Sequence, residues 1–406
     1  MKPIQFRAID PGELDAMADT MGLAFGFEPS DDATERLRQV LPLERTRCGF
    51  DGDVMVGTSG TFELDMTVPG GSVPCAGTTM VAVAPTHRRQ GVLRQMMRSH
   101  LDDVVDHGEP IAALWASDSA IYGRFGYGLA SVNHDIEVKR ANVVFHRNAP
   151  EPAPVRLIDL EQAATMLPPF FEGLRVGIPG FFHRDETWWK QRRFSDPEHN
   201  RDGMTSQRLG VVEGGAGIEG YVQFRVKSKW DDGHGAGRLT VRELLGTTPG
   251  SWAGLWSFVL NHDLIEVITA DNRPTWEPLF DLLEGPRRAR ATQSDALWVR
   301  LMDIPAALTS RSYSTSIDVV FEVTDPMGDV SGTYRLHGDE EGAECAPTSD
   351  PATIRLDLED LGACYMGRSR FEQLARSGRV SGTPEALRAA DRAFTWEPQP
   401  WCQEIF

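Results

Sequence analysis

A basic turn between a short apolar run and an amphipathic stretch has the most specific chemistry in this sequence. Where such a turn opens a helix, backbone N–H groups and the helix dipole converge on one point, and a glycine lets a bulky anion approach. Arginines in the turn add charge-assisted contacts to phosphate oxygens. We therefore predict a pyrophosphate site, the alternative being an ordinary solvated turn. The residues are Val81, Ala82 and Val83 of the run, and Arg88, Arg89, Gln90, Gly91, Val92, Leu93 and Arg94 of the turn.

A second motif, Ala120-Ile121-Tyr122-Gly123-Arg124-Phe125-Gly126-Tyr127, follows the next predicted strand. The turn resembles the R-x-x-G-x-[GA] loop of GNAT acetyltransferases, except that Leu93 stands where glycine or alanine is usual. The second motif resembles the A-x-Y-x-x-x-G-[FY] pattern of the same enzymes. Both occur in the expected order, which makes chance an unlikely source of the match.

The resemblance narrows to the Eis family of tripartite acetyltransferases and extends over the whole chain, densely at the start and loosely in the middle. It implies a GNAT domain, a degenerate GNAT-like domain and a sterol-carrier-like domain whose C-terminus reaches the active site. It also implies acetyl-CoA as cosubstrate, a homohexamer, and acetylation of amines on aminoglycosides or lysine side chains. The further matching segments are Leu114-Trp115-Ala116-Ser117, Leu297-Trp298-Val299-Arg300 and Pro305-Ala306-Ala307-Leu308.

The same resemblance assigns roles to the site residues. Val81, Ala82 and Val83 would run beside the pantetheine, the turn would hold the pyrophosphate, and Ser117 with Asp118 would lie where two strands separate to admit the thioester. Tyr122 would be the general acid and the terminal carboxylate of Phe406 the general base. A phenol pKa of about 10 lies close to a thiol pKa of about 8.5, so that proton transfer is nearly balanced. Tyr127 is the rival acid, although packing is its expected role, and for Phe406 the alternative is an apolar anchor.

The acceptor pocket is less defined by the sequence. Phe25 and Phe27 lie where the first predicted helix ends, while Glu28, Asp31 and Glu404 are candidate partners for ammonium groups. The stretch from 31 to 40 has no tryptophan, and the chain ends in Glu-Ile-Phe where family members have Phe-Glu-Phe. The departure leaves open whether aminoglycosides are accepted, although a small cationic amine is the expected substrate.

Composition restricts the partners. The 406 residues have a formal net charge of −18, which disfavours nucleic acid and anionic lipid and favours cationic molecules. No apolar stretch is long enough to span a membrane, and no signal-peptide core follows Met1, so a cytoplasmic protein is expected. The five scattered cysteines form no C-x-x-C pair and the histidines no metal-ligand spacing, so neither a disulfide framework nor a metal site is expected.

These motifs need three domains to position them, and the expected fold class is α/β followed by α+β. Residues 1–150 alternate helix and strand signals, and a proline-rich stretch at 149–154 suggests a linker. Residues 151–301 repeat the layout in part, with the turn at 246–251 lacking an arginine to hold phosphate. Residues 302–406 turn to strands followed by helices, and the apolar end of the chain predicts a docked C-terminus.

Two other functions compete with a small-amine acetyltransferase. The runner-up within the enzyme class is a protein lysine acetyltransferase. From another class comes a lipid- or sterol-binding carrier with vestigial GNAT domains, although the intact turn and Tyr122 argue against loss of activity.

Overall fold

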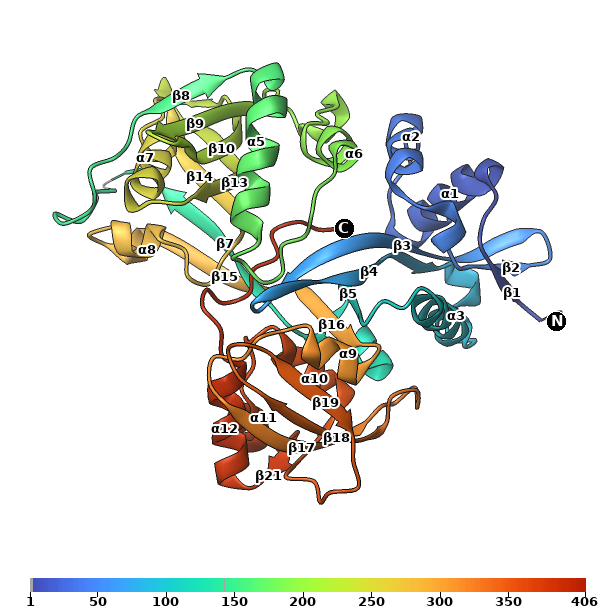
Figure 1. The fold of residues 1–406 in the computed structure, drawn as a ribbon. Helices are drawn as coiled ribbons and strands as arrows, with labels where there is room; N and C mark the ends of the chain where they lie inside the picture. The colour runs from blue at the N-terminus through green and yellow to red at the C-terminus, as the bar shows by residue number, and fades with distance from the viewer. Residues whose placement is uncertain (1–2, 142) are drawn as a thin grey trace.

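The computed structural model describes residues 3–141 and 143–406 and shows three lobes (Figure 1). The first two are each built on a seven-stranded sheet, and the third on a five-stranded sheet. The tandem α/β layout with a terminal α+β lobe confirms the expected fold class.

The first lobe has its strands in the order β1-β2-β3-β4-β5-β16-β6. The β2–β3 hairpin forms around Asp51-Gly52-Asp53, whose Asp-Gly pair favours a tight reversal. Asp10 N donates to Glu13 Oε2 at 2.9 Å where the first helix starts. The strands are β1 (Gln5–Arg7), β2 (Cys48–Asp51), β3 (Val54–Val68), β4 (Gly71–Val83), β5 (Ile111–Trp115), β6 (Gly128–Leu129) and β16 (Leu297–Leu301). The helices are η1 (Pro11–Glu13), α1 (Leu14–Phe25), α2 (Asp31–Val40), η2 (Leu43–Arg45), η3 (Pro85–His87), α3 (Val92–Asp106), α4 (Ser119–Tyr122) and η4 (Gly123–Phe125).

The second lobe has the strand order β15-β7-β14-β13-β10-β9-β8. Its strands are β7 (Val132–Lys139), β8 (Val155–Ile158), β9 (Arg208–Gly214), β10 (Gly217–Lys227), β13 (Gly237–Gly246), β14 (Ile265–Arg273) and β15 (Ala289–Asp295), with a separate hairpin of β11 (Trp230–Asp231) and β12 (His234–Gly235). Its helices are α5 (Leu160–Arg175), α6 (Glu186–Trp188), η5 (Trp189–Arg193), η6 (Glu198–Asn200), α7 (Pro249–Leu260), α8 (Leu279–Leu282) and η7 (Pro286–Arg288).

The first two lobes share one internal layout. In the first, α3 connects the parallel pair β4 and β5; in the second, α7 connects the parallel pair β13 and β14. A hairpin of two antiparallel strands precedes each unit, β2–β3 in one and β9–β10 in the other. The predicted second copy of the layout is therefore present.

Each of the two sheets contains a strand from the part of the sequence that forms the other lobe. The expected domain boundary at residue 150 does not account for this exchange. β7 lies between β14 and β15 in the second sheet although it precedes residue 150. β16 pairs with β5 and β6 in the first sheet although it follows the whole second lobe. Strand pairing is non-local, so a linker composition such as that at 149–154 does not reveal which sheet a neighbouring strand joins.

The third lobe has the strand order β19-β18-β17-β20-β21. Helices α10 to α12 follow the first four strands, as the sequence predicts, whereas α9 precedes them and β21 lies between α11 and α12 along the chain. The strands are β17 (Ile317–Thr324), β18 (Gly332–Gly338), β19 (Ala343–Pro347), β20 (Ile354–Asp357) and β21 (Ser381–Gly382). The helices are α9 (Ile304–Thr309), α10 (Leu358–Tyr365), α11 (Phe371–Arg376) and α12 (Pro384–Phe394).

The segment after α12 leaves the third lobe and ends between the other two (Figure 1). Trp401 and Cys402 are fully buried, and Phe406 is 7% exposed. Trp401 N donates to Pro179 O at 2.9 Å in the second lobe, and Asn133 Nδ2 donates to Cys402 O at 2.7 Å. These contacts confirm the predicted docking of the C-terminus.

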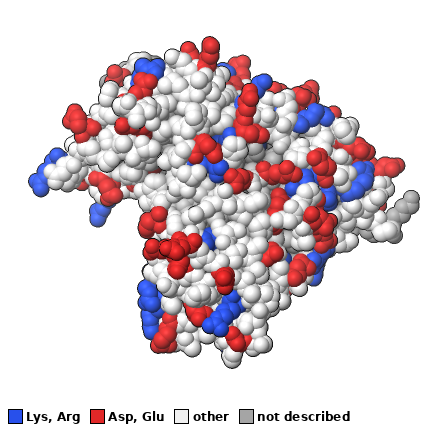
Figure 2. Space-filling view, in the orientation of Figure 1, with Lys and Arg blue, Asp and Glu red and all other residues white. Residues whose placement is uncertain are grey.

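Charged groups cover much of the surface. Figure 2 shows acidic side chains spread over this face of the molecule with basic ones scattered among them. Within the part of the chain that the structure describes, no helix is both long and apolar enough to cross a membrane.

Candidate active site

A cavity of about 1010 Å³ in the first lobe, bordered also by Pro326 and Met327 of the third lobe, gathers most of the predicted cofactor residues. Those that line it are Val81, Ala82, Val83, Arg88, Arg89, Gly91, Val92, Leu93, Arg94, Ser117, Asp118 and Tyr122, together with Phe25 from the predicted acceptor set. Gln90 does not line this cavity. Its Nε2 donates to Thr86 O at 3.0 Å, and this bond links two parts of the turn outside the cavity. Phe27, Glu28, Glu404 and Phe406 also lie outside its lining.

The turn before α3 has the backbone shape of an anion site. Arg89 and Gly91 have φ angles of 62° and 82°, in the left-handed region, and Gly91 is the N-cap of α3 without any side-chain cap. The first-turn N–H groups of a helix have no intrahelical acceptor, so in an uncapped helix they are available to a ligand. The residues present therefore fit the pyrophosphate of CoA.

The corresponding helix of the second lobe is capped instead. Ser251 N donates to Thr248 Oγ1 at 3.1 Å, and Thr248 N donates to Ser251 Oγ at 3.0 Å. This reciprocal cap occupies first-turn donors of α7, and no arginine stands nearby in the turn at 246–251. The second lobe thus keeps the layout of the first without its anion-binding turn.

Arg88 differs from the other arginines of the turn, because its guanidinium already has protein partners. Nε donates to Val83 O at 3.3 Å and Nη2 donates to Ala24 O at 3.0 Å, which links the end of α1 to the turn. Arg89 and Arg94 are exposed at the cavity. Arg88 holds the shape of the turn, and Arg89 and Arg94 present the free charge.

The strands β4 and β5 separate above the turn. They pair only from Cys75 to Gly77 on β4, although β4 continues to Val83 and β5 to Trp115. A register shift against β3 puts Met80 at a φ of 54°, and Thr58 Oγ1 donates to Met80 O at 2.7 Å. A bulge of this kind re-aims the strand and disrupts its pairing. Backbone groups of residues 81–83 consequently face an opening, as the resemblance implies.

Tyr122 lies on the wall of this opening and is 4% exposed. Burial raises the pKa of its phenol to about 12, and a hydrogen bond with the Ser117 side chain lowers that pKa in part. The group is therefore protonated throughout the physiological range. With a thiol pKa of about 8.5, proton transfer from this phenol is less balanced than its free pKa of about 10 implies.

Tyr127 does not line the cavity, and its hydroxyl is part of a buried network of polar side chains. Its hydroxyl lies 3.0 Å from Thr78 Oγ1, which in turn lies 2.8 Å from His100 Nε2, while Thr61 Oγ1 lies 3.2 Å from His100 Nδ1. Burial raises the pKa of Tyr127 and lowers the pKa of His100 to about 4. The expected packing role of Tyr127 agrees with this placement.

The last residues of the chain lie in an aromatic pocket between the lobes. The Phe406 ring packs edge-on against Phe182 with centroids 5.8 Å apart, and Trp188 lies 5.2 Å from Phe182 in the same manner. Arg192 Nη2 donates to Ile405 O at 2.8 Å and fixes the backbone just before the terminus.

Glu404 lies in a different environment from the one expected for a residue that binds an ammonium group. It is a buried carboxylate whose Oε2 lies 2.6 Å from Arg184 Nε and whose Oε1 accepts from Trp188 Nε1 at 2.6 Å. Arg184 also pairs with the buried Glu243 at 2.8 Å. Glu404 therefore anchors the tail and has no free charge for an ammonium group. Sequence reasoning missed this because the partners lie far apart along the chain.

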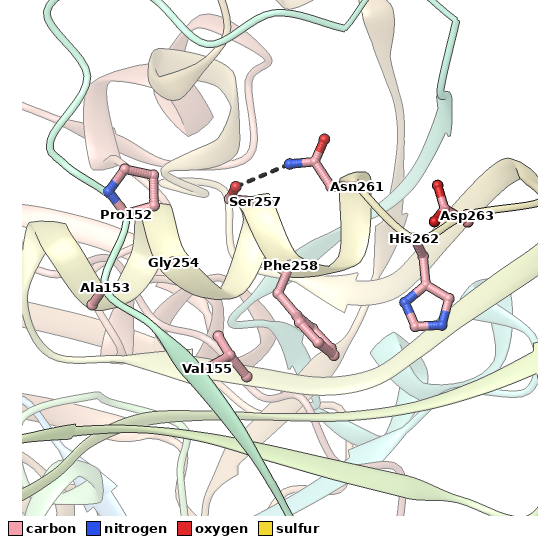
Figure 3. A pocket seen from close by; sticks show the side chains of 9 residues that line it. All are labelled: Pro152, Ala153, Val155, Gly254, Ser257, Phe258, Asn261, His262 and Asp263. Carbon is pink, nitrogen blue, oxygen red and sulfur yellow. Dashed lines mark hydrogen bonds between the residues drawn. The ribbon is translucent and has the colours of Figure 1, made fainter.

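The remaining predicted acceptor residues divide in two. Phe25 lines the cavity at the end of α1, whereas Phe27 and Glu28 are exposed outside it. A separate hollow of about 560 Å³ lies on the second lobe beside α7 and the proline-rich segment (Figure 3). There Asn261 Nδ2 donates to Ser257 Oγ at 3.1 Å and His262 stands next to Asp263, remote in sequence from the cofactor turn. Among the described residues, no group of three or more potential metal ligands is found.

Comparison with known proteins agrees with this geometry. A GNAT acetyltransferase domain model matches residues 5–130, a second one matches residues 180–301, and a sterol carrier protein domain model matches residues 304–403. The uncapped turn, the separated strands and these matches define a GNAT-type N-acetyltransferase, an enzyme that uses acetyl-CoA as cosubstrate.

Related sequences and a solved structure identify the family within the GNAT enzymes. An uncharacterised N-acetyltransferase from Streptomyces avermitilis is 38% identical over 402 residues, 96% of each chain. The N-acetyltransferase Eis of Mycobacterium tuberculosis is 34% identical over 356 residues, 84% of each chain. The crystal structure of Eis1 from Mycobacterium abscessus superposes with a TM-score of 0.84 at 27% identity, covering 99% of this chain and 100% of that one. The chain belongs to the Eis family of N-acetyltransferases.

Proposed function

We propose that this enzyme transfers the acetyl group of acetyl-CoA to a small primary amine, with Tyr122 as general acid and the terminal carboxylate of Phe406 as general base. The observation that supports it most is the single cavity that brings the uncapped turn, the separated strands and Tyr122 together. Acetyl-CoA supplies a thioester, whose C–S bond breaks as the amine nitrogen forms a C–N bond.

Two protons move in this reaction. The amine loses one as the amide forms, and the departing thiolate gains one. Two observations support Tyr122 as the donor to sulfur: its phenol is protonated at neutral pH, and it lines the cavity together with Ser117. The base must accept a proton from the amine. Phe406 is proposed because its backbone is fixed at the junction of the lobes by the bond between Arg192 and Ile405. A free carboxyl pKa of about 3.5 makes it a weak base unless burial raises that value or a water relays the proton.

Two classes of amine acceptor are compatible with the proposed transfer. A polycationic amine of the aminoglycoside type is supported by the net charge of −18 and by the exposed Glu28. It is no longer supported by Glu404, which is paired with Arg184. A lysine side chain of another protein is the second acceptor class, because the turn and Tyr122 serve any amine that reaches the cavity.

The lipid-carrier alternative draws less support from the structure. Aromatic side chains pack together in the interior of the third lobe, with Phe321 stacked on Phe371 at 5.8 Å and Phe394 edge-on to Phe371 at 5.1 Å between ring centroids. We further propose a homohexamer, for which light scattering on the purified enzyme gives the mass directly.

Release of free thiol from acetyl-CoA, followed with a panel of amines, tests the activity. Thermal unfolding with and without acetyl-CoA tests cofactor binding separately, since a specific ligand stabilises the folded state by mass action. A stabilised protein that acetylates amines supports the proposal, whereas the absence of any stabilisation at saturating acetyl-CoA would favour the carrier.

A further inference from the structure

A second cavity, of about 390 Å³, opens between the first and second lobes. We name it the arginine cavity after Arg36 of α2, Arg192 of η5, Arg225 of β10 and Arg242 of β13, which line it. Its other walls are apolar or neutral, and no aspartate or glutamate stands among its lining residues in the described part of the chain. A basic concave site is notable in a chain whose formal net charge is −18.

The four guanidinium groups are only partly neutralised. Arg36 pairs with Asp32 and Arg225 pairs with Asp196, while Arg192 and Arg242 have no carboxylate within ion-pair distance among the described residues. Two of the four cations therefore lack an ion-pair partner within residues 3–141 and 143–406, although Glu404 acts on Arg192 and Asp271 acts on Arg242 at longer range, and Asp196 is shared with Arg201. Burial lowers the pKa of Arg192, and burial with the neighbouring arginines lowers the pKa of Arg242. A bound anion would relieve this repulsion.

Donor capacity is also left over inside the cavity wall. Arg225 is 4% exposed, and its Nη1 donates to Asn200 O at 2.9 Å. Its Nε is buried and has no hydrogen-bond partner in the described structure. Buried donors of charged groups are costly to leave unpaired, so a ligand oxygen at this place would be stabilising.

Arg192 connects the arginine cavity to the proposed catalytic carboxylate. Its guanidinium lies over the Trp188 ring at 5.2 Å from the centroid, and its Nη2 is bonded to Ile405 O. The stacking and this bond hold the group in one orientation. An acceptor whose far end reaches the cavity would therefore lie along the tail that ends in Phe406.

The negative net charge of the molecule does not cancel this local field. At an ionic strength of about 0.1 M charges are screened beyond roughly 10 Å, so distant surface carboxylates contribute little at the cavity. The guanidinium fork matches the oxygens of carboxylate and phosphate better than a point charge does. The site is thus suited to an oxyanion.

We propose that the arginine cavity binds an oxyanion of the acceptor, so that the substrate is a primary amine carrying a carboxylate or phosphate at its other end. The inference rests on the proposed acetyl transfer to amines and specifies its substrate class. It distinguishes such a zwitterion from the polycationic acceptor.

Matched acceptors test the proposal. Straight-chain primary amines of increasing length, ending in methyl, ammonium, carboxylate or phosphate, are compared by kcat/KM in the thiol-release assay. Loss of one charge-assisted contact costs about tenfold to one-hundredfold in affinity, so the oxyanion-ended amines of the best length should exceed the methyl-ended ones by at least tenfold. The carboxylate and phosphate arms show which oxyanion is preferred.

Variants assign the preference to the cavity. Arg242→Gln removes one of the unpaired charges without touching the tail, and it should abolish most of the preference while leaving kcat for the methyl-ended amine unchanged. Arg192 is not used for this comparison, because its bond to Ile405 fixes the backbone beside the proposed base and its replacement would change kcat for every amine. Lys190→Gln is the matched control, because Lys190 is an exposed cation of the same η5 segment outside the cavity lining.

Binding of inorganic phosphate to the enzyme gives a readout independent of turnover. Calorimetry should detect binding in the wild type and the Lys190→Gln variant, and weaker binding in Arg242→Gln. If ammonium-ended amines are used as well as oxyanion-ended ones, or if Arg242→Gln leaves the preference unchanged, the inferred substrate class is wrong while acetyl transfer stands. If no amine of any kind releases thiol, the proposed function itself fails.

Discussion

Replacing Tyr122 by phenylalanine separates general acid catalysis from every other role of this residue. The change removes one hydroxyl from a side chain that is 4% exposed. It leaves in place the ring, whose centroid lies 6.1 Å from the centroid of the Tyr127 ring. Folding and acetyl-CoA binding should therefore persist. General acid catalysis contributes about 10² to 10⁴-fold, so we expect kcat to fall by that factor.

The raised pKa of Tyr122 bears on how much kcat depends on this phenol and on how kcat changes with pH. The pKa of the buried phenol, about 12, lies roughly 3.5 above the pKa of about 8.5 of a free thiol in water, which corresponds to about 5 kcal/mol if burial leaves the pKa of the thiol unchanged. Because the protonated phenol is the active form, wild-type turnover should not decline through loss of this proton until pH approaches 12. Ser117→Ala removes the hydrogen bond that lowers this pKa, so the phenol becomes a weaker acid and kcat should fall.

The assay is thiol release at saturating acetyl-CoA, with kcat followed against pH for each variant. Tyr127→Phe is the matched control, since it deletes a hydroxyl bonded to Thr78 inside the core instead of one at the cavity. That variant should lose some stability and keep its kcat. A Tyr122→Phe enzyme that keeps its kcat, or a Tyr127→Phe enzyme that loses it while remaining folded, would refute the assignment.

Three further outcomes are expected. Arg88→Ala combined with Arg89→Ala should weaken acetyl-CoA binding more than tenfold in calorimetry, because one change releases the turn from its carbonyl partners and the other removes a free charge; unchanged affinity would contradict the loop assignment. Amidation of the Phe406 carboxylate by semisynthesis should abolish turnover and spare cofactor binding, whereas Phe406→Leu should retain much of the activity; a normal rate after amidation would exclude this carboxylate as base. The pKa of His100 is about 4 in the folded protein and 6.5 as a free side chain, so the unfolded chain takes up a proton first as pH falls, and about 3 kcal/mol of stability should be lost between pH 6.5 and 4. Urea unfolding of the wild type and of His100→Gln at both pH values measures this loss. An equal loss of stability in the variant would contradict the prediction.

Local patterns explain why much of the site could be predicted from the sequence. The turn at 88–94 lies within the strand–helix–strand unit of β4, α3 and β5, and Ser117 and Tyr122 follow that unit directly, so short-range geometry decides their placement. Asp51-Gly52-Asp53 likewise determines a hairpin through its own backbone preferences.

Features built from distant segments were not predictable in this way. The exchange of β7 and β16 between sheets depends on pairing partners more than a hundred positions away, such as Asp295 opposite Val132. The pairing of Glu404 with Arg184, which overturns its expected role, joins the tail to the second lobe. The arginine cavity likewise draws its residues from four separate elements, so no window of sequence contains its pattern.

The core of the molecule shows why these distant features belong to one catalytic unit. One continuous hydrophobic cluster includes Met66 and Ile111 of the first sheet, Phe321 and Leu361 of the third lobe, and Phe406 at the end of the chain. The third lobe is therefore packed onto the first sheet as part of a shared interior. Its folding delivers the chain terminus to the junction of the lobes, where Arg192 fixes Ile405. If the terminal carboxylate is the base, as we propose, its position depends on the packing of all three lobes, so acetyl transfer should require all three even though the cofactor turn lies in one.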